Sequence, residues 1–240
     1  MKYLSTYKLF ENNTQDEELN QLVKDAFNFY SSIKKVPMQY YVDERIDNIL
    51  AMNKFKSLEQ PKAILFFNKR PFTRFEKEYN AYTSFLISFK EKNSEIIGID
   101  LYKMKSKKGT LYIMKGRKGE ITIFTQHFFD RYYQRTISLN TNRIPTEKER
   151  EKAINKFISS LAKQYVDDPV GARIDDDGVS IFTPYSDGFG LGFIINGNVF
   201  VKTFIDEKQM NKIQATKIND FKNQYNKFTE EEKRIYKGMN

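Results

Sequence analysis

The chain of 240 residues has no cysteine, no tryptophan and a single histidine. Without cysteine it can form no disulfide, no thiolate zinc site and no iron–sulfur cluster. No apolar run approaches the roughly 20 residues that a membrane-spanning helix needs, and the N-terminus lacks the apolar core of a signal peptide. We therefore expect a soluble, cytoplasmic protein that uses no metal, no cofactor and no membrane partner.

Positive charge is the main excess in the composition. Lysine and arginine number 40 against 31 aspartate and glutamate residues, so the formal net charge is +9 at pH 7. Such a charge favours polyanionic partners, above all nucleic acid or an acidic protein surface. A codon bias toward lysine would produce the same charge without any function, and composition alone does not separate these two explanations.

The apolar periodicity of the first half predicts a helical N-terminus followed by an antiparallel β meander. A helix is expected after Thr14, which has capping-box spacing to Glu17, and another after Asp43. Residues 61–74 fit either a strand or a helix end. From residue 82 the period changes to two, and lysine-rich glycine turns separate the expected strands. These are Tyr82–Phe89, Ile96–Met104, Thr110–Met114 and Ile121–Phe124.

The second half predicts a helix–helix–antiparallel sheet unit. Thr125 is the expected N-cap of one helix, and Pro145 is well placed near the first turn of the next. Asn196-Gly197 is a strong hairpin signal, and a polar C-terminal helix is expected from Asp206. The expected strands are Val170–Ile174, Val179–Thr183, Leu191–Ile195 and Val199–Ile205. The fold class is therefore α+β, with a region over 1–124 and a second over 125–240.

The only histidine begins the sequence HFFDRYYQR, which ends at Arg135. At about 100° per residue, His127, Arg131 and Arg135 lie within about 80° of one another on a helix. Asp130 and Gln134 adjoin them, and the four aromatic residues occupy the other side. The pattern predicts a helix whose aromatic face packs on a sheet and whose polar face presents the histidine and both arginines.

These residue types suit the cleavage of a phosphodiester. RNA cleavage needs a base for the 2′-hydroxyl proton, and His127 titrates near neutral pH. The guanidinium groups of Arg131 and Arg135 match phosphate oxygens and stabilise developing charge. Asp130 is a candidate to orient the imidazole or to raise its pKa. The alternative is a solvated helical face whose charges pair among themselves and whose histidine is incidental.

The order of elements around this helix resembles the barnase–EndoU–colicin–RelE superfamily of small metal-independent RNases, and its RelE- and BrnT-like toxins in particular. The residues that carry the resemblance are His127, Arg131 and Arg135, and it extends at most over residues 120–215. It implies that a polar residue of a late strand, here Thr203, completes the site. This sequence departs from the family pattern in its strand region, which has no second histidine or well-placed glutamate as acid–base partner of His127.

A second candidate surface is a strip of basic residues across the β meander. Basic charge near exposed aromatic rings suits contact with a nucleic-acid backbone and stacking of bases, and Tyr102 and Tyr112 are interleaved with the strip. Lysines that protect a sheet edge would give the same pattern. The strip consists of Lys103, Lys105, Lys107, Lys108, Lys115, Arg117 and Lys118.

Two further motifs favour structure over chemistry. Asp175-Asp176-Asp177 precedes a glycine and lacks the alternating spacing of a calcium loop, so a tight turn is favoured over a metal site. The glycines of residues 188–192 precede no helix, which excludes a dinucleotide fingerprint and favours a close backbone approach. Two functions stay open: an RNase-like protein that interacts with RNA, and a non-catalytic structural or assembly protein of a phage or mobile element. The second would place the chain in a virion and use the basic surface on nucleic acid or an acidic protein.

Overall fold

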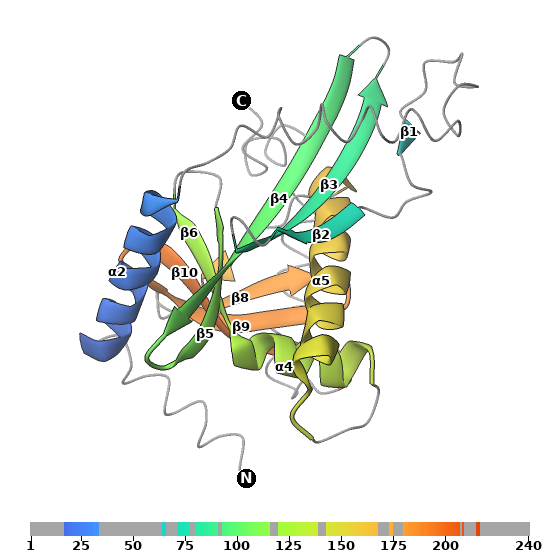
Figure 1. Ribbon diagram of the computed structural model, residues 1–240. Helices are drawn as coiled ribbons and strands as arrows, with labels where there is room; N and C mark the ends of the chain where they lie inside the picture. Colours follow the sequence, from blue (N-terminus) through green and yellow to red (C-terminus); the bar gives the residue numbers. More distant parts are fainter. Residues whose placement is uncertain are drawn as a thin grey trace.

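The computed structural model describes residues 17–33, 64–65, 72–76, 80–90, 93–115, 120–138, 143–167, 173–174, 180–206, 208 and 215–216. Three of its helices, shown in Figure 1, are α2 (Glu17–Ser32), α4 (Gln126–Thr136) and α5 (Glu147–Asp167). Its strands are β1 (Ile64–Leu65), β2 (Phe72–Glu76), β3 (Ala81–Lys90), β4 (Asn93–Ser106), β5 (Gly109–Lys115), β6 (Ile121–Thr125), β7 (Arg173–Ile174), β8 (Ser180–Tyr185), β9 (Gly188–Ile195) and β10 (Asn198–Ile205).

These ten strands form one sheet in the order β1-β3-β4-β5-β6-β10-β9-β8-β7, with β2 paired to β3. The parallel pair β6–β10 joins two antiparallel parts, and Val199 lies opposite Thr122 in its register. The sequence predicted two antiparallel sheet regions, and the structure contains both, joined into one sheet by a parallel pair that the sequence did not predict. The expected boundary before Thr125 falls at the end of β6, inside the continuous sheet. Pairing between strands so distant in sequence leaves no local signal.

Helices cover both faces of the sheet, which gives the α+β fold predicted from the sequence (Figure 1). On one face, α2 buries Val23, Ala26 and Tyr30, which recur at helical spacing. On the other face, α4 and α5 cover an aromatic cluster that includes Phe124 and Phe157. A strand under both layers has both its faces buried, so its side chains alternate between two cores.

Most of the predicted elements are confirmed, with the ends of the strands moved by a few residues. In the hairpin between β9 and β10, Asn196 and Gly197 have φ of 50° and 74°, as a type I′ turn requires. Thr14, the helix after Asp43, the Asp175–Asp177 turn and most of the expected C-terminal helix lie outside the described residues. Within the described part of the chain, no helix is both long and apolar enough to cross a membrane.

Candidate functional site

Helix α4 begins at a cap that also holds strand β10. The hydroxyl of Thr125 accepts a hydrogen bond from the backbone N–H of Phe128 at 3.1 Å, so the predicted N-cap is confirmed. The same hydroxyl donates to the carbonyl oxygen of Lys202 in β10 at 2.7 Å. One side chain therefore fixes the first turn of α4, which contains His127, against β10.

The aromatic face of α4 is buried, as the sequence predicted. Phe128, Phe129 and Tyr132 have no exposed surface. The ring centroids of Tyr132 and Phe204 are 4.9 Å apart, and those of Phe128 and Phe124 are 5.0 Å apart. Edge-to-face and tilted aromatic pairs at these distances each add about 0.5–1.5 kcal/mol beyond the burial of their area. Side chains on the other face of α4 are thus carried by a rigid support.

The polar face of α4 carries the predicted group of charges. His127 is exposed, while Arg131 and Arg135 are partly buried. Nη1 of Arg131 donates to Oε1 of Gln134 at 3.0 Å, and Nε2 of Gln134 donates to the carbonyl oxygen of Arg143 at 2.7 Å. Gln134 therefore connects the side chain of Arg131 to the segment that leads from α4 to α5.

The environment of His127 favours its neutral form. The largest cause is the loss of water around the ring, which lowers its pKa even though part of the side chain is exposed. The second largest is the positive charge of Arg131, which also lowers the pKa. Arg135 and Lys202 act in the same direction, and Asp130 acts against them. Asp130 therefore raises the pKa of His127, as the sequence suggested, but the net shift is downward. The cations and the lost water outweigh the carboxylate.

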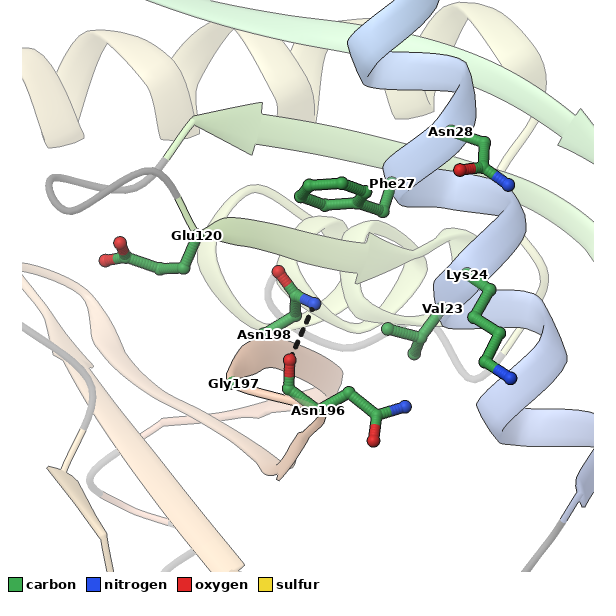
Figure 2. A pocket seen from close by; sticks show the side chains of 8 residues that line it. All are labelled: Val23, Lys24, Phe27, Asn28, Glu120, Asn196, Gly197 and Asn198. Carbon is green, nitrogen blue, oxygen red and sulfur yellow. Dashed lines mark hydrogen bonds between the residues drawn. The ribbon is translucent and has the colours of Figure 1, made fainter.

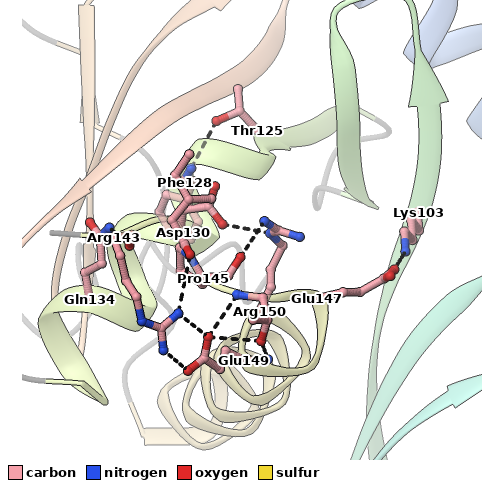
Figure 3. Close-up of polar contacts among 12 residues, drawn as sticks. Lys103, Thr125, Phe128, Asp130, Gln134, Arg143, Pro145, Glu147, Glu149 and Arg150 are labelled. Carbon is pink, nitrogen blue, oxygen red and sulfur yellow. Dashed lines mark hydrogen bonds and ion pairs between the residues drawn. The ribbon is translucent and has the colours of Figure 1, made fainter. Parts of the chain in front are cut away.

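Asp130 instead holds the two helices together. Its Oδ1 accepts from Nε of Arg150 in α5 at 2.7 Å, and both side chains are at most 15% exposed. Figure 3 shows this ion pair next to the contacts of Glu149 with Arg143. The hydroxyl of Tyr133 in α4 also donates to Glu149, at 2.8 Å. These charges fix α4 to α5 and so contribute to the position of the His127 face.

The sequence analysis did not single out Arg150 or Glu149, although a capping-box pattern in the sequence indicates Glu149. Thr146 and Glu149 form a capping box, in which the N–H of Glu149 donates to the threonine hydroxyl and the N–H of Thr146 donates to the carboxylate at 2.9 Å. The spacing Thr-x-x-Glu is readable in the sequence. The pairing of Arg150 with Asp130 depends on how α4 and α5 pack, and the spacing of the two residues in the sequence does not predict it.

The structure places Thr203 beside a β-bulge, next to Lys202. Val201 pairs with Gly192 and Thr203 pairs with Leu191, so the register of β10 against β9 shifts between Val201 and Thr203. Thr203 is partly buried. Within the described residues, no hydrogen bond joins its hydroxyl to the imidazole of His127. The residue of β10 that acts on the titration of His127 is Lys202.

The structure divides the predicted basic strip between two faces of the sheet. Lys103 forms an ion pair with Glu147 of α5 at 3.0 Å (Figure 3), and Lys105 lies on the same side of β4. Lys108 pairs instead with Glu18 of α2, on the other face. Lys107 and Lys115 are exposed, and Arg117 and Lys118 lie outside the described residues.

The interleaved tyrosines do not offer rings for base stacking, and this expectation is corrected. Tyr102 is 8% exposed and Tyr112 is 2% exposed. Tyr102 lies in the core under α2, and Tyr112 lies in the core under α4 and α5. Because helices cover these two rings, neither tyrosine is available to stack on a base.

A pocket of about 540 Å³ lies between α2 and the β9–β10 hairpin (Figure 2). Lys24 and Phe27 line it from α2, Glu120 lines it just before β6, and Asn196 and Asn198 line it from the β9–β10 hairpin. The pocket lies at the start of β6, where Glu120 precedes the strand, whereas His127 lies just after the end of β6. A strand of this length spans about 16 Å at roughly 3.3 Å per residue. The pocket is therefore separate from the polar face of α4.

Although Asn198 lines the pocket, its side-chain amide is engaged in hydrogen bonds to the backbone. Its Oδ1 accepts from the N–H of Ile121 at 3.0 Å, and its Nδ2 donates to the carbonyl oxygen of Asn196 at 3.1 Å. Both contacts fix the start of the parallel pair β6–β10. Phe27, which is 41% exposed, and Lys24 are exposed on the wall that α2 provides, and Asn196 and Gly197 are exposed on the side of the hairpin.

Within the described residues, no group of three or more acidic or histidine side chains is placed to hold a metal ion. Asp187 is engaged by the hydroxyl of Tyr132, which donates to it, and by Lys156 at 3.7 Å. Comparisons of the chain with protein-family models, with curated proteins and with solved structures found no match. The candidate site is therefore defined by the polar face of α4 and by β10 beside it.

Proposed function

We propose that the protein acts on RNA as a metal-independent RNase-like protein, with its site on the polar face of α4. The observation that carries the proposal is the grouping of the single histidine with cations from two elements. Arg131 and Arg135 of α4 and Lys202 of β10 all lower the pKa of His127. A neutral imidazole beside several positive charges suits the removal of a proton next to a phosphodiester.

The roles follow from the protonation states. His127 is neutral at pH 7, so it takes the proton of the 2′-hydroxyl, and such a base typically contributes about 10²–10⁴-fold. Arg131 and Arg135 bind the phosphate oxygens and stabilise the charge that grows on them in the transition state. Thr203 is a candidate for a further hydrogen bond to the substrate. The group that protonates the leaving oxygen is not assigned.

The order of elements supports the same proposal. Strand β6 leads into α4, which is followed by α5 and then by strands β7, β8, β9 and β10. Strand β10 returns to lie beside β6, so it carries Lys202 and Thr203 next to the start of α4. A helix bearing histidine and arginine against the last strand of a sheet is the arrangement that the resemblance to the barnase–EndoU–colicin–RelE superfamily implies.

One observation favours a second function, in which the protein binds nucleic acid or an acidic protein without cutting. Asp130 is the one carboxylate among the groups that act on the pKa of His127, and it is engaged by Arg150. Within the described residues, His127 thus has no obvious acid–base partner. A structural or assembly protein of a phage or mobile element needs only the positive surface.

The deciding experiment is an RNA cleavage assay with a chelator present. The proposal expects cleavage by the wild type and a loss of about 10²–10⁴-fold in rate for His127→Gln. Because His127 is exposed, this variant should keep its thermal midpoint at pH 7.5. Lys24→Gln removes an exposed charge from α2 and is the matched control, which should cleave normally. Binding with a steep salt dependence and no cleavage would establish the second function.

A further inference from the structure

The bulge in β10 changes which residues of this strand face the core. Val201 and Phe204 both lie in the aromatic cluster under α4 and α5, although they are three positions apart. Strict alternation would place Thr203, not Phe204, on the same side as Val201. The register shift between Val201 and Thr203 accommodates the difference. It therefore keeps both Lys202 and Thr203 out of that core, at the point where α4 begins.

The backbone at the bulge is held by the first residue before α4. Thr125 donates to the carbonyl oxygen of Lys202 at 2.7 Å while it caps α4 through the N–H of Phe128. Bulges commonly re-aim a side chain next to a functional site. Here the re-aimed lysine and His127, the second residue of α4, are placed relative to each other by a single hydroxyl.

Positive charges from two elements act on His127. Arg131 and Arg135 of α4 and Lys202 of β10 each lower its pKa, and Asp130, which is paired with Arg150, acts in the opposite direction. Lys202 is partly buried, and the loss of water lowers the pKa of its amine as well. Holding several cations close together and partly out of water costs free energy, which a bound anion would recover.

We propose that Lys202 is the third cation of a phosphate subsite that it forms with Arg131 and Arg135, and that this subsite binds the backbone phosphate of RNA. The choice of RNA as the source of the phosphate rests on the function proposed above. The subsite itself rests on the bulge, on the Thr125 contact and on the cations. It adds Lys202 of β10 as a binding residue beside those of α4, whereas the family resemblance implied Thr203 as the residue that the strand contributes.

The chain offers a direct probe because it has only one histidine. The imidazole signal of His127 can be followed by NMR without assignment, and its pKa reports any charge that arrives or leaves nearby. Lys202→Gln should raise this pKa, since a neighbouring cation is lost. Lys24→Gln, which removes an exposed lysine on α2, should leave it unchanged. No shift in Lys202→Gln, or an equal shift in both variants, would contradict the proposal.

Binding is measured with two probes, inorganic phosphate and a 2′-deoxy oligonucleotide that cannot be cut through a 2′-hydroxyl. Each should raise the pKa of His127 in the wild type, because an anion offsets the cations. Lys202→Gln should weaken oligonucleotide binding about tenfold, as expected for one charged hydrogen bond, and Lys202→Arg should retain most of it. Unchanged affinity in Lys202→Gln would overturn the subsite. Because the bulge contact uses the backbone carbonyl, these variants should fold, which a thermal melt checks.

The subsite and the proposed function fail in different ways. If Lys202→Gln weakens binding but the wild type cuts no RNA, the subsite stands and the RNase proposal falls. If cleavage depends on His127 while Lys202→Gln keeps the KM and kcat of the wild type, the RNase proposal stands and the subsite falls. Where both hold, Lys202→Gln should raise KM, with kcat reduced only insofar as the lysine contacts the transition state more strongly.

Discussion

The hydroxyl of Thr125 donates a 2.7 Å hydrogen bond to the carbonyl oxygen of Lys202, a residue 77 positions later in the chain. This contact links the end of β6 and the first turn of α4 to the bulge in β10. It couples the formation of a helix cap to the pairing of two strands that are distant in sequence. Stability and the geometry of the candidate site therefore depend on the same small side chain.

Replacing Thr125 by alanine should lower the free energy of unfolding by about 1–2 kcal/mol. Loss of an N-cap typically costs about 1 kcal/mol, and the carbonyl of Lys202 loses its donor as well. Urea denaturation measures the change. Thr136→Ala is the control in the same helix, because that hydroxyl donates to the carbonyl of Tyr132 in the preceding turn. An equal cost for both variants would show that the cap and the strand contact contribute little.

The ion pair of Asp130 and Arg150 should matter more than an exposed one. Asp130→Asn leaves a guanidinium that is 12% exposed without its carboxylate, and we expect a loss of about 2–3 kcal/mol, below the cost for fully buried pairs. Asp130→Asn combined with Arg150→Met should cost less than the sum of the single changes. Chemical denaturation of the four proteins gives the coupling energy.

The control for that prediction is the surface pair of Lys108 and Glu18, whose side chains are 49% and 74% exposed. Solvent screens such a pair, so Glu18→Gln should cost less than about 1 kcal/mol. If Asp130→Asn proves as mild as Glu18→Gln, the contact between α4 and α5 does not depend on this ion pair.

Gly192 should tolerate no side chain. A Cβ built on it would overlap the carbonyl oxygen of Phe200 on the neighbouring strand, so the backbones of β9 and β10 would have to separate. We expect Gly192→Ala to lose more than about 3 kcal/mol or to fail to fold. Gly197→Ala meets no atom within 4 Å and only strains a positive φ of 74°, which costs about 1–2 kcal/mol. Thermal melts of the two variants distinguish a clash between strands from the local strain of a turn.

Local patterns predicted the parts of the site that a helix organises by itself. The cap at Thr125 and the separation of aromatic and polar faces of α4 depend on spacing within a dozen residues, and the structure has both. The glycines of β9 were expected to allow a close backbone approach, and Gly192 does so. Such features follow from helix geometry and from the size of a side chain, which can be seen in the sequence alone.

What the sequence could not predict depends on contacts between distant segments. The parallel pairing of β6 with β10 brings Lys202 to His127, and no spacing encodes it. The burial of Tyr102 and Tyr112 follows from helices on both faces of the sheet. Alternation predicts that side chains point to two sides, but not that both sides are covered. The ion pair of Asp130 with Arg150 likewise requires α4 and α5 to be packed.

The stability of the protein should depend on His127 below neutral pH. Its pKa in the folded chain lies below the ordinary value of 6.5, because loss of water, Arg131, Arg135 and Lys202 outweigh Asp130. The unfolded chain therefore binds the proton more readily, and the free energy of unfolding rises with pH across this window. The stabilisation is present above pH 6.5 and is lost as the pH falls through the folded pKa. Urea denaturation between pH 5 and 7.5 should show wild type losing stability relative to His127→Gln on acidification. Parallel curves, or a wild type that gains at acid pH, would show that the cations of α4 and β10 do not act on this imidazole.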